Sequence, residues 1–306
     1  MYHSILVPLD GSAFAEAALP VACAIARRSG AVLHLARVHV AAAAPLQYAR
    51  GSVLAAGSGV GPAVEEEAGT PAPDYLNATA ERLAEDGIHT ATRLLDGPSV
   101  GSLIEYADSI DADLVVIATH ARGPLARVWT GSVARGLVLQ GHRPCLLIRP
   151  RRGDVTPDAA RLFRHVLIPL DGSAASEDVV SRAVSLGALG PARYTLLQVL
   201  SPPTVEGYAV PPGLSLNWSD LQERQAEATL ERMAAQLRLR SLDVAKAVIR
   251  SAHIARAIRK YAGTHDVDLV AVTTYGSGLS RMALGNVADH VARESPVPVL
   301  LYQPAR

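Results

Sequence analysis

The sequence has few cysteines and no excess of charge of either sign. Its 306 residues contain two cysteines, Cys23 and Cys145, and both lie in apolar stretches. Such sparse cysteine usage excludes a disulfide-built fold, so we expect both thiols to be buried and free. The formal net charge is zero, with 29 basic and 29 acidic side chains. A dedicated nucleic-acid-binding protein usually carries a basic excess, so this balance argues against nucleic acid as a partner.

The sequence also lacks the segments that would address it to a membrane. No apolar run approaches the roughly 18 residues that a spanning helix needs. Residues 1–10, MYHSILVPLD, lead directly into a strand pattern, with neither the basic segment nor the cleavage site of a signal peptide. We therefore expect a cytoplasmic protein with no membrane partner.

Signatures of several enzyme classes are missing as well. Lysine occurs only at positions 246 and 260, so the first half cannot hold the lysine-bearing loop of P-loop enzymes, and no Gly-x-Ser-x-Gly elbow of a hydrolase is present. His34, His39 and His120 have no further ligands at workable spacing, so we interpret them as structural and expect no metal site. In the second half, Gln198 is expected at the position of His39, which argues against a shared metal role. We predict a protein that is not an enzyme, with weak ATP hydrolysis left open.

What the sequence does contain is a repeat. The segment HSILVPLDGS at residues 3–12 is repeated as RHVLIPLDGS at residues 164–173, with the same Asp-Gly-Ser ending. Three further echoes follow in the same order, pairing ADLVVIATH with VDLVAVTTY, TGSVARGLV with LGNVADHVA, and RPCLLIRP with VPVLLYQP. Four echoes in one order indicate a duplicated domain. We expect domains at 1–150 and 164–306, joined by a linker at 151–163.

Each half alternates short apolar runs with amphipathic segments. In the first half we expect strands at 4–9, 31–40, 88–95, 113–118 and 145–149. Helices are expected from Ser12 to Gly30, from about 74, at 99–108 and from Gly131. We expect long excursions from this pattern at 41–73 and, in the second half, at 201–218. This alternation predicts an α/β fold of two repeated, Rossmann-like doubly wound domains. Each domain would hold a five-stranded parallel sheet in the order 3-2-1-4-5, flanked by helices.

Doubly wound sheets bind ligands outside the carboxyl ends of their strands, where the strand order reverses. Asp10 follows the first strand at that point. With Ser12 it is suited to organise the turn and cap the next helix, and its carboxylate is equally suited to a ligand's ribose hydroxyls. After the fourth strand, Gly131 and Ser132 open a helix whose first-turn N–H groups could meet phosphate oxygens, although helix capping explains the pair equally well.

VPLDGS, a strand ending in HV, DLVVIATHARG, GSVA and a short last strand together resemble the universal stress protein family. The resemblance covers nearly the whole chain, twice. Nucleotide-binding members of that family hold ATP phosphates on a loop of Gly, two residues, Gly, nine residues, Gly and Ser or Thr. They hold ribose and adenine with the aspartate after the first strand and with the end of the second strand. The resemblance therefore implies ATP or a related adenine nucleotide, with Mg²⁺ accompanying it, at a site formed by Asp10, Val40, Ala118, Ala121, Gly131 and Ser132.

The loop departs from the family pattern in both halves. Ala118 and Ala121 replace its first two glycines, while the nine-residue spacer at 122–130 is intact. Alanine at positive φ costs on the order of 1 kcal/mol, about tenfold in affinity. In the second half Thr273 and Gly276 take these positions, the spacer is one residue shorter, and Asn286 replaces the serine. We expect the first half to bind nucleotide and the second to be structural or regulatory.

Two functions stay open. One is a non-catalytic stress-response protein with a nucleotide-dependent surface for unidentified protein partners, and the other is a nucleotide-free interaction protein whose site is lost. Because domains of the family pair through their last strands, RPCLLIRP and VPVLLYQP are expected to pair within one chain. The halves would then form an intrachain pseudo-dimer, and a homodimer of chains stays open.

Overall fold

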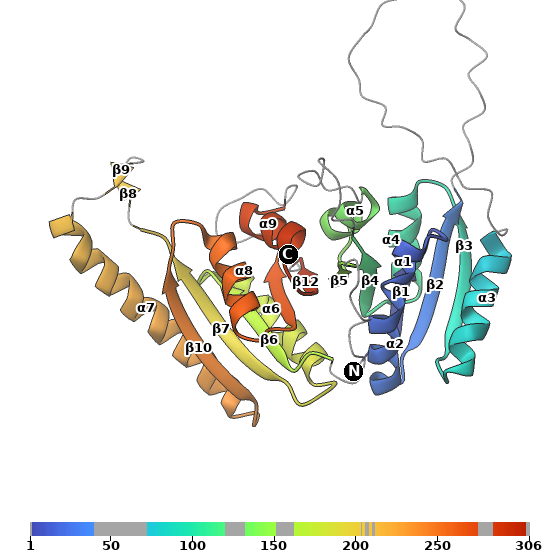
Figure 1. Ribbon diagram of the computed structural model, residues 1–306, viewed down its shortest axis with the longest axis horizontal. Coiled ribbons are helices and arrows are strands. Elements are labelled where there is room, and N and C mark those ends of the chain that lie inside the picture. Colours follow the sequence, from blue (N-terminus) through green and yellow to red (C-terminus); the bar gives the residue numbers. More distant parts are fainter. Residues whose placement is uncertain are drawn as a thin grey trace, which may run out of the picture.

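The chain forms an α/β structure with helices on both faces of one mostly parallel sheet (Figure 1). The computed structural model describes residues 2–39, 72–119, 132–150, 162–202, 204–205, 208–209, 212–274 and 284–303. The predicted fold class of two repeated α/β halves is confirmed. Most of the expected linker and most of the first excursion lie outside the described residues.

The first half contributes five strands and five helices in its described part. The strands are β1 (Ser4–Pro8), β2 (Val32–His39), β3 (Thr90–Asp96), β4 (Leu114–Ala118) and β5 (Cys145–Ile148). The helices are α1 (Ala13–Glu16), α2 (Leu19–Ser29), α3 (Ala72–Glu85), α4 (Ser99–Ser109) and α5 (Ser132–Gln140).

The second half repeats this succession. Its sheet strands are β6 (His165–Leu170), β7 (Arg193–Leu200), β10 (Asp243–Arg250), β11 (Leu269–Thr273) and β12 (Val299–Tyr302). Its helices are α6 (Ala174–Gly187), α7 (Pro212–Arg238), α8 (Ile254–Thr264) and α9 (Asn286–Glu294). Two short strands, β8 (Thr204–Val205) and β9 (Tyr208–Ala209), pair only with each other. The excursion expected at 201–218 is therefore shorter than predicted, because α7 begins inside it.

The ten sheet strands lie in the order β10-β7-β6-β11-β12-β5-β4-β1-β2-β3. In Figure 1 they run across the molecule from β10 on the left to β3 on the right. Strands within each half are parallel, whereas β5 and β12 pair antiparallel where the halves meet. The predicted pairing of the two last strands within one chain is thereby confirmed.

The helix predicted from Ser12 to Gly30 is broken into two pieces. Ser12 Oγ accepts a hydrogen bond of 3.1 Å from Ala15 N and caps α1, and Gly30 ends α2 with φ of 74°. Both predicted ends are confirmed. The interruption has a local cause: Pro20, in the first turn of α2, has no N–H to donate to the carbonyl four residues earlier, and its ring clashes with that carbonyl.

Two hydrophobic clusters cover the two faces of the sheet, and each contains residues of both halves. One cluster takes side chains from α2, α3, α6 and α7, and the other takes them from α4, α5, α8 and α9. Alternate residues of β5 enter opposite clusters, as the period of a strand requires: Leu146 enters the first and Leu147 the second. The duplicated halves therefore share their cores.

Candidate functional site

The turn after β1 holds Asp10 at the carboxyl edge of the sheet. Asp10 Oδ1 accepts hydrogen bonds from Ser12 N at 2.9 Å and from Ser12 Oγ at 2.6 Å. Gly11, between them, has φ of 92°, a conformation that glycine adopts without steric cost. Asp10 is nevertheless exposed to solvent. The turn-organising role is thus present in the structure, and the carboxylate is open to a ligand.

The second half builds the same turn from the same residue types. Asp171 Oδ1 accepts hydrogen bonds from Ser173 N at 2.9 Å and from Ser173 Oγ at 2.5 Å. Gly172 has φ of 81°. The Asp-Gly-Ser turn is therefore a duplicated feature, and by itself it does not distinguish a binding half from a non-binding half.

Three of the six predicted site residues lie in the part of the chain that the structure describes. β1 and β4 are neighbours in parallel register, with Ile5 opposite Leu114, so their carboxyl ends meet at one edge. Asp10 follows β1, half-buried Ala118 ends β4, and exposed Ser132 begins α5. Val40, Ala121 and Gly131 lie outside the described residues, and the ligand-binding roles of all six residues stay predictions.

Thr119 is a residue of this edge that sequence reasoning missed. Its backbone N–H donates to Ile148 O at 2.8 Å, and the residue is 7% exposed. Its hydroxyl oxygen is buried and has no hydrogen-bond partner among the described residues, and the same holds for Thr274, which follows β11. A buried polar group left unpaired costs about 1–3 kcal/mol, so two equivalent cases call for an explanation. The sequence does indicate this residue, since the repeated segments ADLVVIATH and VDLVAVTTY both have a threonine at this position.

The histidines near the site have structural contacts. His34 Nδ1 lies 3.1 Å from the Tyr106 hydroxyl, and burial lowers the pKa of His34 below its usual value. His39 Nδ1 lies 3.6 Å from an oxygen of Asp96. Within the described ranges, no group of three His, Cys, Asp or Glu side chains is arranged to hold a metal ion.

The expected match of Gln198 with His39 is wrong. Pro8 lies opposite Ala36 in the first half, and the equivalent Pro169 lies opposite Leu197 in the second. Arg37 follows Ala36 and Gln198 follows Leu197, so Gln198 is the counterpart of Arg37. Strand register, which the similarity of short segments does not fix, decides this correspondence.

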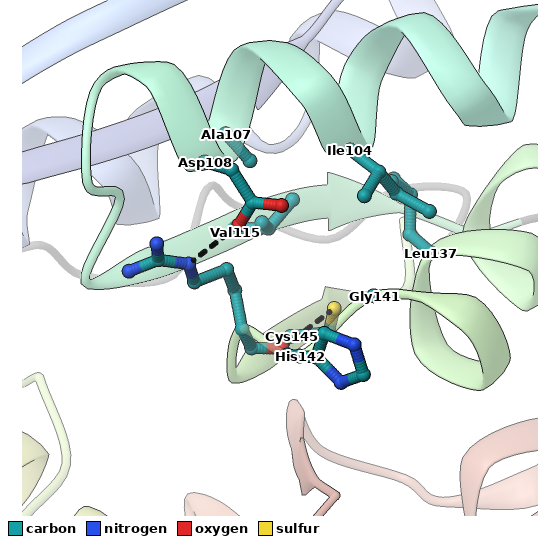
Figure 2. A pocket seen from close by; sticks show the side chains of 9 residues that line it. Ile104, Ala107, Asp108, Val115, Leu137, Gly141, His142 and Cys145 are labelled. Carbon is teal, nitrogen blue, oxygen red and sulfur yellow. Dashed lines mark hydrogen bonds and ion pairs between the residues drawn. The ribbon is translucent and has the colours of Figure 1, made fainter.

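One small cavity lies away from the carboxyl edge. It is bounded by α4, α5 and the starts of β4 and β5, with Val115 and Cys145 in its wall (Figure 2). Its volume of about 10 Å³ is room for about one water molecule. Val115 and Cys145 stand at the amino ends of their strands, so this cavity is on the opposite edge from Asp10 and is too small for a nucleotide.

The two cysteines are buried and free, as predicted. Burial raises the pKa of Cys23 to about 11 and that of Cys145 to about 12.

None of the helices in the described part of the chain is long and apolar enough to cross a membrane.

The fold and the edge together define a class: a tandem pair of doubly wound α/β domains sharing one sheet, each with an Asp-Gly-Ser turn where its strand order reverses. The sequence pattern of the Universal stress protein family matches residues 1–149 and 162–303. The chain belongs to the universal stress protein family.

Relatives match over the full tandem arrangement. A universal stress protein of Mycobacterium tuberculosis is 27% identical over 313 aligned positions, covering 98% of this chain and 96% of the relative. One of Mycolicibacterium smegmatis is also 27% identical and covers 99% and 97%. Among solved structures, a universal stress protein from Archaeoglobus fulgidus aligns with a TM-score of 0.65 at 16% identity, covering 99% of this chain and 96% of that one. At that identity the structural likeness shows the fold.

Proposed function

We propose that this protein binds an adenine nucleotide, ATP or a close relative, in its first half and acts in a stress response without catalysing a reaction. The observation that carries binding is the position of Asp10, and the choice of the first half rests on its intact nine-residue spacer and on Ser132, where the second half has Asn286. Its exposed carboxylate is fixed by the turn with Ser12 at the carboxyl edge, where the ends of β1 and β4 meet. In this proposal the bound nucleotide shapes a surface for protein partners.

In this proposal each predicted residue contacts a different part of the nucleotide. Asp10 accepts hydrogen bonds from ribose hydroxyls, and the backbone at Val40 contacts adenine. The N–H groups of the loop from Ala118 to Gly131 and the Ser132 hydroxyl meet the phosphates, with the positive end of the α5 dipole behind them. Mg²⁺ accompanying the nucleotide would offset phosphate charge; within the described residues no group of three His, Cys, Asp or Glu side chains is arranged to hold it.

We propose binding without turnover because the nearby carboxylates already have partners. Asp10 Oδ1 holds the turn. Glu16 accepts hydrogen bonds from the Tyr75 hydroxyl at 3.0 Å and from Arg82 at 2.9 Å. Glu16 is therefore not placed as an unengaged general base, and in this proposal the other oxygen of Asp10 contacts the ribose.

A second candidate, a nucleotide-free interaction protein, is favoured by one observation. Ala118 ends β4 with a methyl group at the place where the family's loop begins with glycine, and a methyl there limits the approach of backbone to phosphate.

Titration calorimetry with ATP separates these two candidates. Asp10→Asn keeps an oxygen for the turn while removing the charge, and Asp171→Asn is the matched control in the other half. We expect Asp10→Asn to weaken ATP binding by about tenfold or more and Asp171→Asn to leave it unchanged. Likewise Gly131→Val should abolish binding and Gly285→Val should not. No heat and no thermal stabilisation at millimolar ATP would establish the second candidate, and the opposite ranking of the variants would move the site to the second half.

A further inference from the structure

Arg37 reaches the carboxyl edge beside Asp10. It lies near the end of β2, one residue beyond the pair of Pro8 with Ala36. A Cβ atom placed on Gly11 would lie 3.2 Å from an Nη atom of Arg37 and 3.5 Å from its Cζ. The guanidinium therefore extends past the end of β1 and lies against the Gly11 backbone, inside the turn that fixes Asp10.

This guanidinium has no counter-ion among the residues that the structure describes. Its recorded contact is with the Tyr75 ring, whose centroid is 5.8 Å from Arg37 Cζ. Burial, and after it the charge of Glu16, raises the pKa of Tyr75 above its usual value, so the phenol stays neutral. Glu16 itself is occupied on both oxygens, by Tyr75 and Arg82. Arg37 is half-buried, and a partly desolvated cation without a partner favours an incoming anion.

The second half keeps the surrounding framework but not the charge. Glu177 pairs with Arg232 at 3.1 Å, as Glu16 pairs with Arg82. Gln198 stands in the place of Arg37, with its Nε2 3.6 Å from a Cβ built on Gly172. Its Oε1 is buried and has no hydrogen-bond partner in the part of the chain that the structure describes. At this position the two halves thus differ by one positive charge.

We propose that Arg37 contacts an anionic group of the ligand and makes the first-half site select phosphorylated adenosine over adenosine. This rests on the proposed function and names the ligand class of the same site. The first half contains no lysine, so Arg37 is the cation that the described residues offer at the end of β2, beside Asp10. The second half, with neutral Gln198, lacks this selection.

Calorimetry with adenosine, AMP and ATP at low and high salt tests the inference in the full chain. Arg37→Gln copies the second half, Arg37→Lys keeps the charge, and Gln198→Arg is the reciprocal control. We expect Arg37→Gln to weaken AMP and ATP binding about ten- to hundredfold, to leave adenosine binding unchanged and to flatten the salt dependence. Arg37→Lys should recover most of the loss, and Gln198→Arg should not alter first-half affinity.

The possible results separate the two proposals. If Arg37→Gln weakens adenosine and ATP equally, or weakens neither, Arg37 is a structural residue and the inference is overturned while nucleotide binding stands. If Arg37→Gln does not fold, Arg37→Met takes its place, because it removes the charge and keeps an apolar stem: a loss specific to phosphorylated ligands supports the inference, and an equal loss for adenosine overturns it. If the natural chain binds none of the three ligands, the proposed function itself fails.

Discussion

Leu146 of β5 lies directly opposite Leu300 of β12, and both side chains are fully buried in the same hydrophobic cluster. The pair lies where the two halves meet in antiparallel register. Nearby, Arg149 donates a hydrogen bond of 2.8 Å to Ala292 O, which also joins the halves. Because strands and core are shared, the halves should unfold together.

Leu300→Ala should lower the free energy of unfolding of the whole chain by about 2–5 kcal/mol, since it opens a cavity at this junction. Denaturant unfolding followed by fluorescence and circular dichroism measures the loss, and a single transition is expected. Leu239→Ala is the matched control, because that leucine is 88% exposed and should change stability by less than about 0.5 kcal/mol. Two separate transitions would contradict the shared core.

Gly11→Ala should destabilise the fold by about 1 kcal/mol or more. The positive φ of Gly11 disfavours a side chain, and the new methyl would press on Arg37. Gly101→Ala is the contrasting change: it lies within α4, and its new methyl would meet nothing within 4 Å. It should stabilise by up to about 1 kcal/mol. Thermal unfolding of both variants checks the opposite signs.

The stability of the protein should fall as the pH drops from 7 toward 5, partly through His165. Burial lowers the pKa of His165, which contacts Thr195 Oγ1 and His265 O, both at 2.8 Å. The unfolded chain therefore binds this proton more readily, and stability present above a pH of about 6.5 is lost below it, by at most about 1.4 kcal/mol per pH unit.

His165→Gln should flatten this pH dependence, measured as the free energy of unfolding at a series of pH values. Some slope should remain because burial also lowers the pKa of His34. Burial raises the pKa of Asp268, and the effect of this shift on stability is opposite to that of His165. The folded protein gains stability from this carboxyl as it is protonated at more acidic pH. Exposed His89→Gln is the control and should leave the slope unchanged. An unaltered slope in His165→Gln would show that this side chain does not carry the effect.

Both thiols should react slowly in the folded protein. Burial excludes reagent, and with pKa values of about 11 for Cys23 and about 12 for Cys145 the reactive thiolate is scarce at pH 8. A chromogenic disulfide reagent should label neither thiol in the native chain on the timescale at which it labels both in denaturant. Cys145→Ala separates the two contributions, and rapid labelling of the native chain would contradict the burial.

Much of the local structure could be predicted from particular residues. Ser12 and Gly30 set the ends of the first helical region because a serine oxygen can accept from an N-terminal N–H and glycine tolerates positive φ. The repeat identified RPCLLIRP and VPVLLYQP as the last strands of the halves, and the resemblance to the family implied that they pair. The break between α1 and α2 was not predicted, because the apolar residues keep helical spacing across it. Pro20 could have indicated this break, since proline has no N–H to donate within a helix.

The sequence by itself determined the duplication, the α/β class and the Asp-Gly-Ser turn, because these follow from local periodicity, hydrogen bonding within a few residues, and repetition. Only the tertiary structure decided which side chains meet across strands. Strand register makes Gln198 the counterpart of Arg37, where similarity predicted His39, and brings the Arg37 guanidinium close to Gly11. Packing buries the Thr119 hydroxyl, which has no hydrogen-bond partner among the described residues. These relationships join residues distant in the chain, so they depend on pairing and packing that no local pattern specifies.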